Sequence, residues 1–186
     1  MMRQGLGTGF QRRFYSGLMP FARDLRQVTK SISPALELSS KNGIAVSFRE
    51  RIMLVVTGVN RCRHCAYGHE LLARRAGLSR IEIATALSLD LSECPEGEIP
   101  GLQFAIHWAE RDGRPTTEAR SELHAAYDQG VARQIEVATL MIHVGNCVGN
   151  TFDYWLSRVS RGRFGLLPSE REMTARALVS GRAGQD

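Results

Sequence analysis

The chain has 186 residues, of which 43% are hydrophobic and 23% are charged, and it carries a net charge of +5 at pH 7. This length is enough for one full hydrophobic core. The composition is that of an ordinary globular protein and excludes disordered chains and collagen-like repeats. No apolar run approaches the roughly 18 residues that a membrane-spanning helix needs, so we expect no membrane span.

The positive charge lies at the two ends of the chain. Residues 1–30 hold six basic residues and one acidic residue, and residues 158–186 hold six basic and three acidic residues. Residues 31–157 hold 12 basic and 15 acidic residues, a net charge of −3. A nucleic-acid-binding protein is expected to carry basic and aromatic side chains together on its folded body. We therefore expect no nucleic-acid partner, and ends that are solvated or that contact another subunit.

Helices are predicted along almost the whole chain after a flexible N-terminal segment, residues 1–17, which is rich in glycine and arginine. Apolar spacing, capping residues and terminal Gly or Pro residues set the predicted helix bounds. The predicted helices cover residues 20–31, 35–42, 47–58, 62–76, 79–90, 101–112, 117–129 and 132–160. No stretch alternates with period two for long enough to predict a strand. The predicted fold is all-α, a single-domain helical bundle over residues 18–162, followed by a basic C-terminal tail, residues 163–186.

Two of these helices begin with a capping-box pattern, in which a serine is followed three residues later by a glutamate. Ser47 and Glu50 form the first pattern, and Ser79 and Glu82 form the second. In a capping box both side chains hydrogen-bond backbone N–H groups at the helix start. The pattern therefore assigns Glu50 a capping role that is compatible with a chemical one.

The last predicted helix combines glycines with polar residues. We expect an interruption near Gly145 and Gly149, because glycine destabilises helix interiors. His143, Asn146 and Asn150 recur at helical spacing within an otherwise apolar stretch. Polar groups on such a face need hydrogen-bond partners when they are buried. We favour internal or inter-subunit hydrogen bonding for them over the lining of a pocket.

A pair of cysteines is the most informative feature of the sequence. Cys62 and Cys65 lie three residues apart at a predicted helix start, which puts both sulfurs on one face and within reach of a disulfide. The positive end of the helix dipole and the free N–H groups there favour the thiolate. A lowered pKa is what makes a cysteine a nucleophile at neutral pH.

Helical geometry selects the partners of this pair. His69 falls within roughly 60° of Cys62 on the helical wheel and shares its face, whereas His64 lies on the far side. Glu50 belongs to the preceding helix, which is apolar all round and is therefore predicted to be buried. A buried carboxylate needs a partner, and a histidine at the neighbouring thiol site is the obvious candidate.

The set Glu50, Cys62, His64, Cys65 and His69, with its fixed spacing, resembles the core motif of the AhpD-like alkylhydroperoxidases within the carboxymuconolactone decarboxylase superfamily. The resemblance covers residues 44–83 and extends more loosely over the helical body to about residue 160. It implies an all-helical fold and a homo-oligomer, a trimer or a hexamer.

The resemblance also implies a reaction. Cys65 would be the peroxidatic nucleophile that becomes a sulfenic acid, and Cys62 the resolving thiol that condenses with it to a disulfide. His69 would take the thiol proton, Glu50 would orient or charge this histidine, and His64 would extend the relay. The implied partners are a hydroperoxide substrate and an external dithiol or lipoylated protein as reductant. No cofactor is implied, and we expect a cytoplasmic protein.

Two alternatives remain open. A decarboxylase-type enzyme acting on a small organic acid would use acid–base residues without the cysteine pair. A structural zinc protein would use the two cysteines with His64 or His69, but this spacing gives three ligands and a closed site needs four, so we expect no metal. Outside the motif, Cys94 is expected to be a partly exposed thiol and Cys147 a small core residue.

Overall fold

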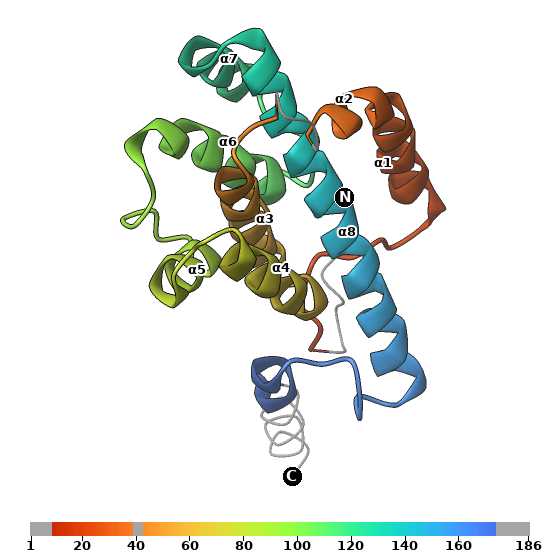
Figure 1. The fold of residues 1–186 in the computed structure, drawn as a ribbon. Coiled ribbons are helices and arrows are strands. Elements are labelled where there is room, and N and C mark those ends of the chain that lie inside the picture. Colours follow the sequence, from red (N-terminus) through yellow and green to blue (C-terminus); the bar gives the residue numbers. More distant parts are fainter. Residues whose placement is uncertain (1–8, 39–42, 174–186) are drawn as a thin grey trace.

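The computed structural model describes residues 9–38 and 43–173, and within them the chain forms helices and connecting loops without strands (Figure 1). This confirms the predicted all-α fold. The helices are α1 (Leu18–Lys30), α2 (Ile32–Glu37), α3 (Val46–Asn60), α4 (Arg63–Arg75), α5 (Arg80–Leu87), the short 3-10 helix η1 (Glu96–Glu98), α6 (Ile99–Glu110), α7 (Thr117–Ala126) and α8 (Gln129–Val159). Residues 168–173 are also helical.

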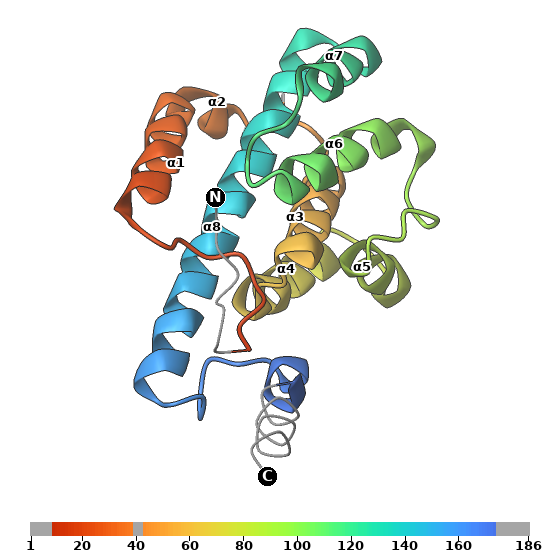
Figure 2. The same ribbon diagram turned by 180° about the vertical axis from the view of Figure 1, so that it is seen from behind.

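Helix α3 lies at the centre of the molecule and packs against α4, α5, α6 and α8 (Figures 1 and 2). Its residues Ile52, Leu54, Val55 and Val56 are fully buried. A helix that is apolar on all sides is stable only when other elements surround it, as they do here. The position of α3 as a buried helix is therefore confirmed, and both of its ends are held rigidly.

Helix α8 is 31 residues long and extends across most of the described part of the molecule (Figure 2). Its buried face includes a polar stripe at helical spacing, formed by Thr139, His143, Asn146, Asn150, Asp153 and Ser157. Its outer face carries exposed apolar side chains, namely Met141, Val148, Phe152, Trp155 and Val159. The first half of α8 buries apolar side chains such as Ile135, Leu140 and Ile142, as an ordinary surface helix does, whereas the second half buries mainly polar groups and exposes apolar ones. Helix α8 therefore delivers hydrogen-bonding groups to the interior.

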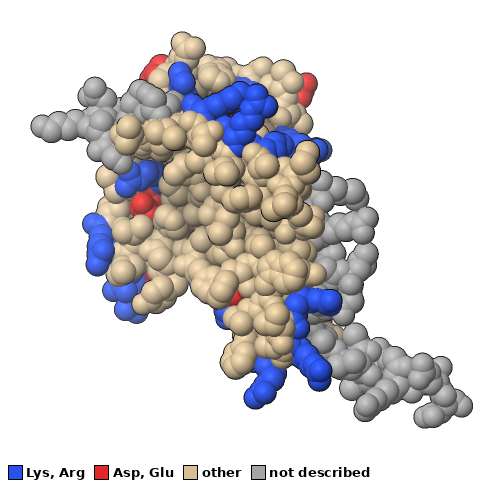
Figure 3. All heavy atoms as spheres, turned by 90° about the vertical axis from the view of Figure 1, so that its right-hand side faces the viewer, with Lys and Arg blue, Asp and Glu red and all other residues tan. Residues whose placement is uncertain are grey.

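The side of the molecule that carries α1 and α8 is largely uncharged, with Lys and Arg side chains towards its margins (Figure 3). Despite its length, α8 does not reach the apolarity of a membrane-spanning helix, and neither does any other helix among the described residues.

Residues 9–17 run beside α8 and are packed, unlike the flexible segment that the composition predicted for residues 1–17. Phe10 and Phe14 form a second apolar cluster with Leu166, and Phe14 stacks on Tyr154 with ring centroids 4.1 Å apart. The glycine content concealed these buried aromatic side chains. Residues 1–8 lie outside the described part, so their predicted flexibility stays a prediction.

Part of the predicted C-terminal tail, residues 163–186, is also packed against the rest of the molecule. Residues 163–173 fold back onto the N-terminal segment, and Leu166 and Glu170 are buried. Two hydrogen bonds from the N-terminal segment, one from the Gln11 N–H and one from Arg12 Nε, reach Glu170. Residues 174–186 lie outside the described part of the chain. The two basic ends of the sequence are therefore in contact with each other through an acidic residue.

The helix-start predictions divide into one confirmed and one wrong. Ser79 accepts a hydrogen bond from the Glu82 N–H, and Glu82 accepts one from the Ser79 N–H, which confirms this capping box. Helix α3 begins at Val46 without a side-chain cap, so the capping box at Ser47 is wrong. The reason is that Ala45 is the N-cap, so Ser47 and Glu50 both lie inside the helix; Glu50 has a different partner, described below.

Two further helix bounds differ from the prediction. Helix α2 ends at Glu37, and residues 39–42 of the predicted 35–42 helix lie outside the described residues. The interruption predicted near Gly145 and Gly149 is absent, because α8 is continuous there. A Cβ atom added at Gly149 would lie 2.9 Å from Cys62 Sγ. This glycine is therefore required by the close approach of the thiol and not by a break in the helix.

Candidate redox-active thiol site

The two cysteines lie at the turn between α3 and α4. Helix α3 ends at Asn60, Arg61 takes the left-handed conformation with φ 55°, and Cys62 is the N-cap of α4. The Cys65 N–H donates to Cys62 Sγ over 3.4 Å, and the two Sγ atoms lie 3.0 Å apart. Both thiols are free. Their spacing confirms that the pair shares one face at a helix N-terminus.

The hydrogen bonds of this turn favour a thiolate on Cys62. The Cys65 thiol, the backbone N–H groups of Cys65 and His64, and the charge of His64 lower the pKa of Cys62 to about 6, although burial acts against them. Sharing a proton with Cys62, together with burial, raises the pKa of Cys65, and a hydrogen bond from Asn146 acts in the opposite direction. The pair is therefore a dithiol that loses its first proton readily and its second with difficulty. Cys62 is buried, whereas Cys65 is partly exposed.

Glu50 and His69 form the first carboxylate–imidazole pair of the site. Glu50 on α3 is 3% exposed, and its Oε2 lies 2.8 Å from Nδ1 of His69 on α4. Arg49 lies 3.6 Å from the other carboxylate oxygen. The sequence argument that a buried Glu50 requires a histidine partner is met by this geometry. It also explains why Glu50 does not cap α3.

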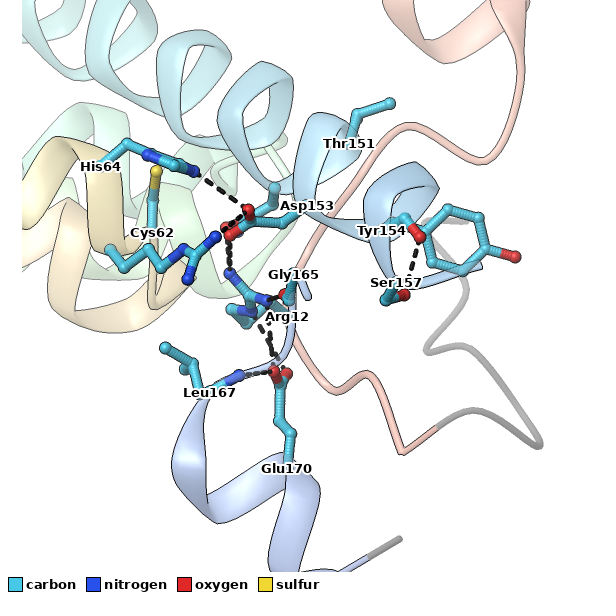
Figure 4. Close-up of polar contacts among 12 residues, drawn as sticks. Arg12, Cys62, His64, Thr151, Asp153, Tyr154, Ser157, Gly165, Leu167 and Glu170 are labelled. Atoms are coloured by element: carbon cyan, nitrogen blue, oxygen red, sulfur yellow. Dashed lines mark hydrogen bonds and ion pairs between the residues drawn. The ribbon is translucent and has the colours of Figure 1, made fainter. Parts of the chain in front are cut away.

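His64 belongs to a second pair. Its Nε2 lies 3.0 Å from Oδ1 of Asp153 on α8 (Figure 4). The sequence analysis placed Glu50, His69 and His64 in one relay, whereas the structure places His64 on a different carboxylate. Each of the two histidines of the motif therefore has a carboxylate of its own.

Asp153 is also the centre of a buried ion cluster (Figure 4). Arg12 lies 2.6 Å from Oδ2 of Asp153 and 3.2 Å from Glu170, and both partners are fully buried. Arg63 lies 2.7 Å from Oδ1, and Arg12 also donates to the Gly165 carbonyl. Burial acts to raise the pKa of Asp153, but hydrogen bonds from the two arginines and from His64 outweigh it and lower that pKa. Asp153 is therefore an ionised carboxylate with only acceptor capacity.

Sequence reasoning missed Arg12, Asp153 and Glu170 as parts of this site. Asp153 continues the spacing of Asn146 and Asn150, and this was the one signal available for it. No spacing rule connects residues 12 and 170 to residue 153.

The polar stripe of α8 hydrogen-bonds within the chain, except for the Thr139 hydroxyl, which is buried without a partner among the described residues. The Asn60 side chain lies 3.2 Å from His143 Nδ1 and donates to Asn146, and Asn146 donates to Thr57. Asn150 donates to the Asn60 carbonyl over 2.8 Å and so holds the turn that leads to Cys62. Burial lowers the pKa of His143 to about 4, so this imidazole is neutral at pH 7. The predicted hydrogen-bonding role of these residues is confirmed.

The remaining two cysteines are not part of the thiol pair. Cys94 is partly exposed, and Cys147 is buried in α8 with a pKa raised by burial, as the sequence predicted for both positions. Among the described residues, no group of three or more His, Cys, Asp and Glu side chains is arranged to hold a metal ion. The two histidines nearest the thiols are directed to carboxylates.

One comparison with known proteins covers the segment that holds the motif. Residues 35–111 match the model of the carboxymuconolactone decarboxylase family. The matched segment holds α3 and α4, with Glu50, both cysteines and both histidines of the motif. No curated protein and no solved structure matched the chain.

Proposed function

We propose that the protein is a thiol-dependent peroxidase that reduces hydroperoxides through Cys62 and Cys65. The observation that carries this proposal is the pair of free sulfurs 3.0 Å apart at a helix N-terminus, one of them with a strongly lowered pKa. A thiolate at such a position is a nucleophile at neutral pH, and a second thiol in contact with it can complete a disulfide.

Accessibility assigns the attack to Cys65, which is partly exposed while Cys62 is buried. Cys65 gives its proton to Cys62 or to His69 and attacks the terminal oxygen of the hydroperoxide. The O–O bond breaks, the terminal oxygen stays on Cys65 as a sulfenic acid, and the leaving alkoxide takes the proton held by Cys62 or His69 and departs as an alcohol. Cys62, as a thiolate, then attacks the Cys65 sulfur, the S–O bond breaks, and the hydroxide leaves as water after taking up a proton from the solvent. One hydroperoxide has been reduced to an alcohol and water, and two thiols have been oxidised to one disulfide.

The pair Glu50 and His69 is suited to the proton transfers of this cycle. Because Glu50 is buried and holds Nδ1 of His69, the opposite ring nitrogen is free to exchange a proton. His69 lies one helical turn after Cys65, on the same face of α4. Return to the dithiol requires a reductant from outside the chain, and we propose a dithiol or a lipoylated protein.

The outer face of α8 supports a homo-oligomer. Its exposed apolar side chains include Phe152 and Trp155, each 61% exposed. Contiguous apolar patches of this kind are typical of interfaces between proteins. We propose that further copies of the chain cover this face.

The test is the mass of the intact protein after equimolar hydroperoxide. We expect the loss of two hydrogen atoms, confined to a peptide that contains Cys62 and Cys65 and reversed by a dithiol. The Cys62→Ser variant should stop at a sulfenic acid on Cys65 that dimedone traps, and Cys94→Ser should behave like the unchanged protein. Peroxide consumption with a dithiol donor that persists in a Cys65→Ser variant would contradict the proposal.

A further inference from the structure

Asp153 has no place in the proposed cycle, although it is fully buried and lies within hydrogen-bonding distance of His64, the residue next to the nucleophile. We infer that Asp153 is a positioning residue that holds the His64 ring beside Cys62 and balances its charge there. This inference rests on the proposed function of the thiol pair. In this inference Cys62 has its own carboxylate–imidazole pair, Asp153 and His64, which is separate from the pair Glu50 and His69.

The surface of α8 shows how His64 and Cys62 are brought together. A Cβ atom at Gly149 would lie 2.9 Å from Cys62 Sγ and 3.7 Å from His64 Cδ2. The thiol of Cys62 and the imidazole of His64 therefore both pack against α8 at Gly149, where there is no side chain. Asp153 follows four residues later on the same face of α8, where it meets Nε2, the ring atom next to Cδ2. Helix α8 thus provides both the space for the pair and the anchor of the ring.

The hydrogen bond to Asp153 also fixes the proton of His64. Hydrogen bonds from two arginines keep Asp153 ionised, so it can only accept, and Nε2 of His64 must carry the hydrogen. The nitrogen that takes up or releases a proton is then Nδ1. The side chain of His64 is 47% exposed, and Phe152 contacts the ring at a centroid distance of 6.3 Å. Without Asp153 the ring would be free to turn towards solvent.

Asp153 could influence the Cys62 thiolate by positioning His64 or simply through its own negative charge. The charged groups around His64 and Cys62 allow these two effects to be distinguished. The groups that face His64 and Cys62 are Arg63 and Cys65 on α4, Asp153 and Cys147 on α8, Arg12 on the N-terminal segment and, behind Arg12, Glu170. Loss of the Asp153 charge alone would leave Arg63 without its anion and Arg12 with Glu170 alone, and would make a thiolate on Cys62 easier to form. Loss of the positioned imidazole would make it harder. The two effects have opposite signs.

The experiment is the ultraviolet absorbance of the thiolate from pH 5 to pH 9 in the Asp153→Asn variant, a measurement that needs no reagent access to the buried Cys62. We expect the midpoint of the profile to rise by about one pH unit, which near pH 6 is an approximately fivefold smaller thiolate fraction. His64→Asn should give a similar shift, and the double variant should add nothing to it. A midpoint that falls or stays unchanged in Asp153→Asn would overturn the inference.

The matched control is Glu170→Gln, which removes the other anion of Arg12 without touching His64. We expect it to lower thermal stability and to leave the Cys62 profile unchanged. If Asp153→Asn does not fold, the tautomer of His64 in the unchanged protein decides, by long-range nitrogen–proton NMR. A hydrogen on Nε2 supports the inference, and a neutral ring with its hydrogen on Nδ1 overturns it. None of these measurements uses peroxide, so a protein without peroxidase activity would defeat the proposed function and still report on Asp153.

Discussion

The two carboxylate–imidazole pairs of the site differ in where their residues come from. Glu50 and His69 are 19 residues apart on consecutive helices, and both lie in the segment that matches the family. His64 and Asp153 are 89 residues apart, and Asp153 in turn holds Arg12, which is 141 residues away. The first pair is thus part of a local helical hairpin. The second pair joins α4 to α8, and its carboxylate also holds the N-terminal segment through Arg12.

This difference shows that the site has two parts. We call Glu50 and His69, with the turn between α3 and α4, the local half. We call His64, Asp153 and the ion cluster around Asp153 the long-range half. The local half needs only α3, α4 and the turn between them. The long-range half depends on a buried ion cluster that also holds the N-terminal and C-terminal segments together. Substitutions in the second half should therefore affect stability as well as chemistry, and substitutions in the first half should affect chemistry more selectively.

The largest expected effect comes from Arg12→Met. This change leaves Asp153 and Glu170 buried without their shared cation, and breaking a buried ion pair in this way costs about 3–5 kcal/mol. Denaturant unfolding measures the loss. Arg13→Met is the matched control, because the Arg13 pair with Asp112 is partly exposed and should contribute less than about 1 kcal/mol. Equal losses of unfolding free energy in the two variants would contradict the description of Arg12 as the centre of a buried ion cluster.

Glu50→Gln should break the local half. It removes the charge that faces His69 Nδ1 while keeping the size of the side chain, and positioned acid–base groups contribute on the order of 10²–10⁴-fold to rate. We expect peroxide reduction with a dithiol donor to fall about 100-fold with the fold retained. Glu70→Gln, on the exposed side of α4, should leave the rate unchanged. A Glu50→Gln enzyme of normal rate would remove this pair from the mechanism.

The polar stripe that connects the two halves should make stability depend on pH through His143. Burial lowers its pKa from 6.5 to about 4, so the folded state favours the neutral ring. The resulting stability is fully present above pH 6.5 and is lost as the pH falls towards 4, by about 2–3 kcal/mol in total. Unfolding of His143→Gln at several pH values should show a smaller slope in this window. His124→Gln, at a partly exposed position, should keep the full slope.

Gly149→Ala is expected to have the smallest effect on stability. It should act on the site by moving the Cys62 sulfur. The added methyl group would displace Cys62 Sγ, the free end of a side chain, and alanine also favours a helix. We expect about tenfold slower disulfide formation with hydroperoxide and a change in unfolding free energy within about 1 kcal/mol. Gly145→Ala is the control, since nothing lies within 4 Å of its Cβ position. Equal rates in the two variants would show that the thiol is not confined at this point.

The sequence predicted the local half and missed the long-range half for physical reasons. Helical spacing places Cys62, Cys65 and His69 on one face, and burial requires a partner for Glu50, so short-range rules suffice there. The all-α fold followed equally from apolar periodicity. For Arg12 no such rule exists, since a long-range ion pair leaves no periodic trace in the sequence. The arginine and glycine content around it is typical of a flexible segment and concealed a buried side chain.

The buried position of Arg12 has a consequence for the order in which the protein is made. A ribosome adds about 5–20 residues per second, so Arg12 is synthesised roughly ten to thirty seconds before Asp153, which lies 141 residues later. Glu170, 158 residues after Arg12, comes later still. The segment that carries Arg12 cannot dock until these acids have left the ribosome. The complete thiol centre is therefore assembled only after Glu170 has been synthesised, later than the central helices.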